Sequence, residues 1–163
     1  MDILIFVCVG ASEYPFDRLL KILDELCDEG IIDGADVVAQ IGSTTYSPRN
    51  YKSFDLIARD DYQRYVDAAD IIITHAGTGS VVPPLRQGKK IIIFPRLVKY
   101  REHLDNHQLE LAETFTQQGY ALCAQNIGEL RKCLGNVEDF IPNQFVSNNT
   151  RLNELVIDYI RQW

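Results

Sequence analysis

The chain alternates between short runs of apolar residues and longer stretches in which apolar residues recur every three or four positions. The apolar runs, rich in β-branched side chains, lie at residues 2–9, 35–41, 71–74, 90–94 and 120–124. Runs of this length that are apolar on both faces are typical of strands buried in a parallel sheet. The pattern therefore predicts several strands that are covered on both sides.

Helical spacing separates these strands. Between residues 16 and 29 the apolar residues recur at helical positions, and Gly30 stands where a helix commonly ends. Further helices are predicted at 60–68, 80–87, from about 104, at 127–134 and at about 150–161. Strands alternating with helices indicate an α/β fold, a doubly wound parallel sheet of Rossmann-like architecture. We expect one domain that spans residues 1–163.

Ligands of such sheets bind beyond the carboxyl ends of the strands, so the loops that follow the strands are the candidate functional segments. These loops are residues 10–15, 42–50, 75–80 and 95–107. The sequence contains no linker and no internal repeat that would divide the chain.

The loop from His75 to Ser80 reads His-Ala-Gly-Thr-Gly-Ser, follows a strand and opens a helix. The free N–H groups and the dipole of a helix N-terminus favour a negatively charged group such as phosphate. Gly77 and Gly79 remove side chains that would block its approach, and Thr78 and Ser80 add hydroxyl groups. The alternative is a tight strand-to-helix turn with no ligand.

Two common phosphate-binding motifs do not fit this loop. A P-loop needs Lys and then Ser or Thr directly after its second glycine, where this chain has Ser80 and Val81. A dinucleotide fingerprint needs a third glycine at the position of Val82 and an acidic residue about 20 positions further on, where Pro95 and Arg96 stand.

Composition narrows the possible partners. The chain has 163 residues, enough for one domain with a sizeable core, and a formal net charge of -7. This charge argues against non-specific binding of nucleic acid, which needs clustered positive charge, but it does not exclude a small anionic ligand. No run approaches the roughly 18 apolar residues of a membrane span.

The N-terminal apolar run lacks a basic leader and is followed at once by Gly10, so it reads as a buried strand and not as a signal peptide. The four cysteines show no C-x-x-C spacing, and we expect reduced thiols in a cytoplasmic protein.

Several segments in a fixed order resemble the glycosyltransferase family 28 C-terminal domain. They are the His75–Ser80 loop, Gly88-Lys89-Lys90 with the strand to Pro95, and Asn106-His107-Gln108. The resemblance runs from the loop at Gly10 to about residue 125. Two kinds of member are similar in layout: the soluble donor-binding subunit of the two-part N-acetylglucosaminyltransferase that acts on dolichol-linked sugar, and the small subunit of bacterial two-part transferases that build capsular or exopolysaccharide units.

The resemblance implies three groups of binding residues in the nucleotide-sugar half of a GT-B glycosyltransferase. The donor diphosphate would be held by Gly10, Ser12, Gly77, Thr78, Gly79 and Ser80. The nucleobase would lie near Ala58 and Arg59. His107 and Gln108 would contact the hydroxyls of the donor sugar, for which both side chains offer suitable hydrogen-bonding groups.

One position departs from the family pattern. Many members carry Glu, an acceptor for the ribose hydroxyls, where this chain has Pro83. The bacterial polysaccharide subunits share this departure, which favours that group. The segment with Arg96, Lys99 and Arg101 fits the same group, and we expect this basic cluster to face a pyrophosphate or a lipid-phosphate surface. The alternative is a solvated loop.

The histidines do not predict a metal site. His103 and His107 are four apart, but no Glu stands where H-E-x-x-H requires it and no third ligand is evident. His75 ends a strand beneath the glycine loop. It could act as a base, but we expect it to order the loop.

The resemblance implies a UDP-sugar-binding subunit of a two-component inverting glycosyltransferase, without a tightly bound cofactor, that moves a hexose to a lipid-diphosphate-linked saccharide. The catalytic base would lie in the partner, a membrane-anchored subunit that binds the acceptor and recruits this cytoplasmic chain to the inner membrane face. The chain would then be inactive alone. The C-terminal helix at about 150–161 would dock this partner or pack on the chain's own sheet.

Two other functions stay open. One is a non-catalytic enhancer, which stabilises a partner transferase after losing donor binding, as Pro83 suggests. The other is a stand-alone nucleotide-binding regulator, which would need no exposed docking face.

Overall fold

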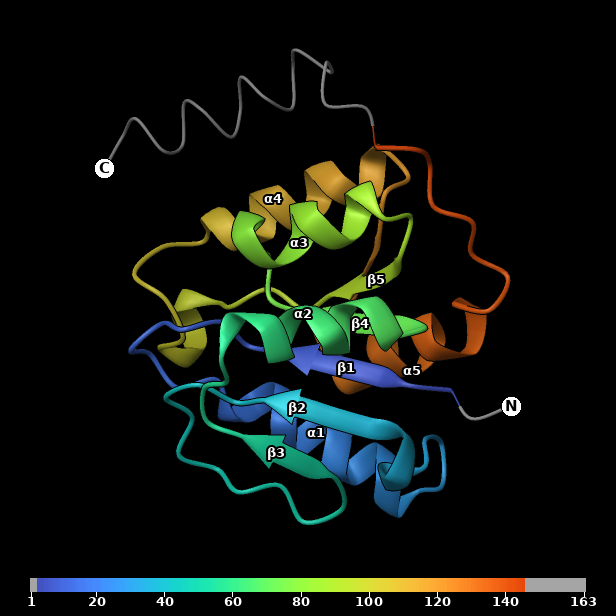
Figure 1. Cartoon of the computed structure of the whole chain (residues 1–163). Helices are drawn as coiled ribbons and strands as arrows, with labels where there is room; N and C mark the ends of the chain where they lie inside the picture. Colours follow the sequence, from blue (N-terminus) through green and yellow to red (C-terminus); the bar gives the residue numbers. More distant parts are fainter. Residues whose placement is uncertain (1–2, 146–163) are drawn as a thin grey trace.

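The computed structural model of the chain describes residues 3–145, which build one six-stranded parallel sheet with the strand order β3-β2-β1-β4-β5-β6 (Figure 1). The strands are β1 (Ile5–Cys8), β2 (Val37–Gln40), β3 (Lys52–Phe54), β4 (Ile71–Thr74), β5 (Lys90–Ile93) and β6 (Leu122–Cys123). The predicted doubly wound, Rossmann-like sheet is confirmed. The helix predicted at about 150–161 lies outside the described residues.

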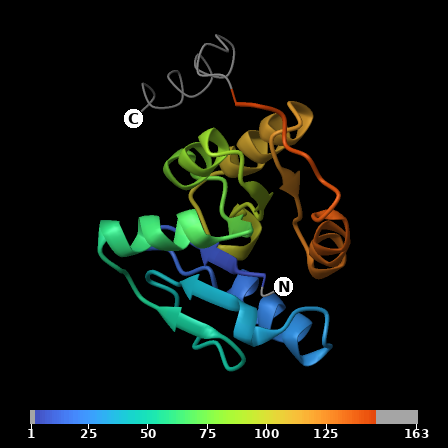
Figure 2. The same ribbon diagram turned by 45° about the vertical axis from the view of Figure 1, so that its right-hand side comes forward.

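Helices cover both faces of the sheet (Figures 1 and 2). They are α1 (Asp17–Asp28), α2 (Arg59–Ala68), α3 (Thr78–Arg86), α4 (His107–Gln117) and α5 (Ile127–Asn136), with two short 3-10 turns, η1 (Gly34–Asp36) and η2 (Val98–Tyr100). Alternate strand residues such as Val7 and Phe6 point into two different clusters, one shared with α1 and α5 and the other with α2, α3 and α4. Within residues 3–145, no helix combines the length and the apolar character needed to cross a bilayer.

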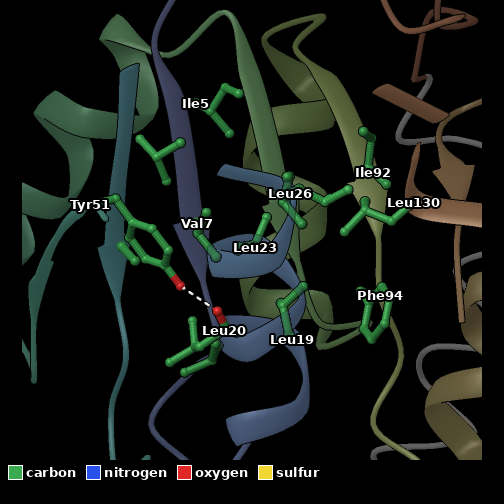
Figure 3. Close-up of a cluster of buried hydrophobic side chains, with 14 of the residues drawn as sticks. Ile5, Val7, Leu19, Leu20, Leu23, Leu26, Tyr51, Ile92, Phe94 and Leu130 are labelled. Carbon is green, nitrogen blue, oxygen red and sulfur yellow. Dashed lines mark hydrogen bonds between the residues drawn. The ribbon is translucent and has the colours of Figure 1, made fainter. Parts of the chain in front are cut away.

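Helix α1 forms the centre of one core (Figure 3). Its apolar residues fall on one side at helical spacing, and Leu19, Leu20, Leu23 and Leu26 are fully buried against β1, β5 and α5. The hydroxyl of Tyr51 donates to the carbonyl of Leu20 at 2.9 Å and ties the chain before β3 to this helix.

The predicted end of this helix is also observed. Gly30 adopts a φ of 70°, its N–H donates to the Cys27 carbonyl at 3.0 Å, and the N–H of Ile31 reaches back to Leu26 at 2.9 Å. Glycine reaches this left-handed conformation without steric cost, so the chain can turn toward β2.

The edge strand β3 was not predicted. It has only three residues, pairs with Val38 to Gln40 of β2, and is exposed or half-buried along its length. The chain returns to form it because the carboxylate of Asp24, buried in α1, accepts hydrogen bonds from the Tyr46 hydroxyl at 2.6 Å and the Asn50 N–H at 2.9 Å. A short strand held by a distant side chain leaves no local sequence pattern.

Replacement of Leu23 by Ala should lower the free energy of unfolding by about 2–5 kcal/mol, because it opens a cavity in a fully buried cluster. Urea denaturation followed by circular dichroism measures this loss. Leu56 is 61% exposed, and Leu56→Ala is the control, expected to change stability by no more than about 0.5 kcal/mol. Equal losses for both variants would contradict the core assignment.

Candidate functional site

The loops after β1 and β4 leave neighbouring strands toward opposite faces of the sheet. The chain passes from β1 to α1 on one face and from β4 to α3 on the other. Such a topological switch point is where ligands bind in doubly wound sheets. The Thr74 hydroxyl at the end of β4 donates to the Cys8 carbonyl at the end of β1 at 2.9 Å, so the two predicted glycine turns begin side by side.

Two of the glycines in these turns make room for the imidazole ring of His75. A Cβ at Gly10 would lie 2.5 Å from Nε2 of the ring, and one at Gly77 would lie 2.1 Å from Cε1. Gly10 also has a φ of 78°, which disfavours other residues. Gly77, predicted to open the backbone to a ligand, therefore lacks a side chain because the histidine fills that space.

Gly79 is different. A Cβ built there would meet nothing within 4 Å, so this glycine faces open space at the start of α3. The N–H groups of Ser80 and Val81 donate to the Gly77 carbonyl at 3.0 and 3.1 Å. Within the part of the chain that the structure describes, the N–H groups of Thr78 and Gly79 find no acceptor. They are available, with the positive end of the helix dipole, to an anionic group.

The ring of His75 connects the glycine loop to two helices. Its Nδ1 lies 3.0 Å from the Gly77 N–H and 3.1 Å from Nε2 of Gln108, and its Nε2 lies 3.3 Å from Oγ of Ser80. Burial of the ring lowers the pKa of His75 to about 3, and the positive charge of Arg96 acts in the same direction. The imidazole is therefore neutral at physiological pH.

The prediction that Arg96, Lys99 and Arg101 form one basic cluster facing a pyrophosphate or a lipid-phosphate surface is wrong for Arg96. Its side chain is buried, with 1% of the residue exposed, and its guanidinium donates to the carbonyls of Val9 at 2.6 Å and Tyr14 at 2.7 Å. Burial lowers the pKa of Arg96 to about 10, so it stays charged at neutral pH. Arg96 joins the turn after β1 to the end of β5 and faces no lipid surface, whereas Lys99 and Arg101 are exposed.

The rest of the loop after β5 is fixed by the buried carboxylate of Glu102. The carboxylate of Glu102, 3% exposed, accepts two hydrogen bonds from Arg18, at 2.7 and 2.8 Å, and one from the Leu97 N–H at 3.0 Å. Glu102 is thus committed to shaping this loop. Among residues 3–145, no three His, Cys, Asp or Glu side chains gather closely enough to hold a metal ion.

Gln108 also differs from the prediction. It is 6% exposed, and its Oε1 accepts from the Ala76 N–H at 3.3 Å and the Arg96 N–H at 3.0 Å. The amide therefore joins the loops after β4 and β5 and does not reach outward to a sugar. His107 opens α4, is half-buried, and places Nδ1 3.2 Å from a carboxylate oxygen of Glu110.

The nucleobase prediction falls at the start of α2, where Ala58 is the cap and Arg59 the first residue, both exposed. Within residues 3–145, no hydrogen bond joins them to the glycine turns. A residue that sequence reasoning missed, Tyr62 in the first turn of α2, donates to Sγ of Cys8 at 3.5 Å, and this sulfur lies 3.8 Å from Oγ of Ser80. The only hint of this contact in the sequence was the position of Cys8 at the end of the first predicted strand.

Known proteins resemble this chain over most of its length. A family model described as glycosyltransferase family 28 C-terminal domain matches residues 4–154. The UDP-N-acetylglucosamine transferase subunit ALG13 of Candida albicans is 33% identical over 93 residues, which are 57% of this chain and 29% of that protein. The chain thus spans less than a third of the length of this relative.

Solved structures share the fold. The NMR solution structure of ALG13 superposes with a TM-score of 0.64 at 22% identity and covers 94% of both chains. The glycosyltransferase of kitacinnamycin superposes with a TM-score of 0.61 at 17% identity, over 95% of this chain and 37% of that one. The architecture is therefore that of one half of a GT-B glycosyltransferase, as the resemblance implied.

Gly77→Ala should destabilise the protein by about 1–3 kcal/mol, because the added methyl overlaps the imidazole of His75. Gly79→Ala is the matched control, since it adds a methyl two residues later where nothing lies within 4 Å. It should leave stability unchanged or raise it by up to about 1 kcal/mol, because Ala favours helix. Equal midpoints of urea denaturation for the two variants would show that the ring does not fill the space beside Gly77.

Proposed function

The chain belongs to the glycosyltransferase family 28 C-terminal domain family, and we propose that it binds the UDP-sugar donor for a two-component inverting glycosyltransferase. The observation that carries this proposal is the open first turn of α3 at the switch point, where Thr78 and Gly79 offer free N–H groups and Gly79 leaves space in front of them. An anionic diphosphate accepts hydrogen bonds only, and it fits such a turn.

The same turn supplies a catalytic contribution. As the bond between the donor sugar and its diphosphate breaks, negative charge grows on the leaving diphosphate, and amides fixed at a helix N-terminus stabilise it. The proposed diphosphate residues are Gly10, Ser12 and the loop from Gly77 to Ser80. The nucleobase is proposed to lie by the exposed start of α2, near Ala58 and Arg59, and the donor sugar by His107 at the start of α4.

The acceptor and the catalytic base are assigned to a partner. An inverting transfer needs a group that takes the proton of the acceptor hydroxyl. His75, which is neutral and buried beneath the loop, is engaged with Gly77, Gln108 and Ser80. We propose that a membrane-anchored partner subunit provides the base, holds a lipid-diphosphate-linked saccharide and recruits this chain to the cytoplasmic membrane face.

The name of the Candida relative favours UDP-N-acetylglucosamine as the donor. The relatives give no support to the expected place in capsule or exopolysaccharide synthesis. That part of the expectation rests on Pro83 and on the exposed cations Lys99 and Arg101, which could face a lipid phosphate.

A second candidate function is a non-catalytic enhancer of a partner transferase. Pro83 is exposed on α3 at the position where many family members have Glu, and it offers no acceptor for the ribose hydroxyls. Loss of this hydrogen-bond acceptor removes one contact to the UDP-sugar but leaves the first turn of α3 intact. The role in binding the UDP-sugar is therefore favoured.

Calorimetric titration with UDP tests the donor site. Gly79→Asp should weaken UDP binding by at least about tenfold, since its carboxylate occupies the open space and repels the diphosphate, while an acid in the first turn is favourable for the helix itself. Gly128→Asp adds the same charge at the second residue of α5 and should change affinity by less than about twofold. Equal binding by the parent and Gly79→Asp would rule out this turn.

Sugar transfer from a radiolabelled UDP-sugar to a lipid-linked acceptor separates the two candidate functions. The chain alone should be inactive, and the co-purified pair with its partner should be active. In the pair, Gly79→Asp should lower the rate by about tenfold to a hundredfold if the chain holds the donor. Full activity of that pair would instead identify the chain as an enhancer.

A further inference from the structure

The side-chain amide of Gln108 can take only one orientation. Its Oε1 lies between the backbone N–H groups of Ala76 and Arg96, at 3.3 and 3.0 Å, and both of these groups can only donate. The oxygen must face them, which turns Nε2 toward Nδ1 of His75, 3.1 Å away. The amide nitrogen can only donate, so it presents a hydrogen to the imidazole.

Two donors therefore meet at one nitrogen of His75. The Gly77 N–H lies 3.0 Å from Nδ1, and Gln108 approaches the same atom. A nitrogen that faces two donors cannot carry a hydrogen itself, so a neutral ring must hold its hydrogen on Nε2. Nε2 lies 3.3 Å from Oγ of Ser80 and donates to it.

Two further groups, the Cys8 thiol and the Tyr62 hydroxyl, lie near the same hydroxyl. The hydroxyl of Tyr62 donates to Sγ of Cys8 at 3.5 Å, and Sγ lies 3.8 Å from Oγ of Ser80. Either Ser80 or the thiol can be the donor in this contact, and the Tyr62 hydroxyl also forms a hydrogen bond with Ser80. Because Oγ of Ser80 accepts from Nε2 of His75, its own hydrogen points away from the ring, toward Cys8 or Tyr62 in the free protein and toward the ligand when one is bound.

We propose that Gln108, acting through His75, fixes the hydroxyl of Ser80 as a hydrogen-bond donor for the ligand. Gln108 and His75 are then positioning residues, and the identity of the ligand as a diphosphate rests on the proposed function. The first turn of α3 would present three donors, the N–H groups of Thr78 and Gly79 and the hydroxyl of Ser80. Such a turn selects a group that only accepts, which is what an ionised phosphate does.

The tautomer of His75 can be measured without any ligand. In long-range ¹H–¹⁵N correlation spectra of the full chain, His75 should show a protonated Nε2 and a bare Nδ1, with no change between pH 5 and 8. Burial of the ring and the positive charge of Arg96 oppose its protonation, and His103 acts in the same direction. The hydrogen bond with Gln108 favours the protonated form but does not outweigh them, and Cys8 and Tyr62 contact Ser80 beside the ring. A hydrogen on Nδ1, or titration of the ring in this range, would overturn the proposal.

Gln108→Glu is the sharpest variant because it keeps the size of the side chain and the acceptor for Ala76 and Arg96. Its second oxygen can no longer donate to Nδ1 and instead favours a hydrogen there. The ¹⁵N signals of His75 should therefore change to those of a protonated Nδ1, while urea denaturation shows that the fold persists. His75→Asn, which removes the signals, confirms their assignment. Unchanged His75 signals in Gln108→Glu would contradict control by Gln108.

Titration with UDP separates this proposal from the proposed function. Ser80→Ala and Gln108→Glu should each weaken UDP binding by about tenfold, and the double variant should lose no more than either alone, because both remove the same hydrogen bond. Additive losses would overturn the coupling. If the parent fails to bind UDP while the His75 tautomer is as described, the result contradicts the proposed donor function and supports the hydrogen-bond network of Gln108, His75 and Ser80. If UDP binds but Nδ1 carries the hydrogen, the result contradicts this hydrogen-bond network and supports the proposed donor function.

Discussion

The divergence of the chain after β1 and β4 is the constraint on which the site depends. The two strands are neighbours, but α1 packs on one face of the sheet and α3 on the other, so their exits separate at the carboxyl edge. The imidazole of His75 fills the space between them, and only glycine fits against it at positions 10 and 77. Held apart in this way, the loops leave the first turn of α3 open at Gly79. The donor-binding role we propose follows from that opening.

Buried polar side chains hold the other loops of this edge in place. A buried charge is stable only when its hydrogen-bonding groups find partners. The terminal nitrogens of Arg96 find them in the carbonyls of the turn after β1, although its Nε has no partner within residues 3–145. Glu102 finds them in Arg18 and the Leu97 N–H. The contacts of Arg96 with Val9 and of Arg18 with Glu102 join segments that are distant in sequence, and they fix the loops after β1 and β5 to each other. A site built on loops fixed in this way has its donors in position before a ligand arrives, which is what electrostatic stabilisation of a leaving diphosphate requires.

The sequence predicted the features that depend on local pattern. The apolar runs located five of the six strands, helical spacing with Gly30 located α1 and its end, and the glycine loop marked the switch point. It could not predict β3, because that strand is short, partly exposed and held by Asp24. It placed Arg96 on the surface and Gln108 at the sugar, because both look polar in sequence and their partners are backbone groups of distant loops. Polar residues whose partners are remote in the chain are what a single sequence does not reveal.

Chemical-shift mapping of backbone amides during titration with UDP tests the central claim most directly. If the diphosphate lies at the start of α3, the amides of Gly10, Thr78 and Gly79 should shift most. The structure offers an internal reference, a cavity of about 370 Å³ at the amino ends of β1 and β4, lined by apolar and charged residues and in part by Ile32 and Gly135. Their amides should not respond. The largest shifts at this cavity, or saturating UDP with no shift in the α3 turn, would contradict the account.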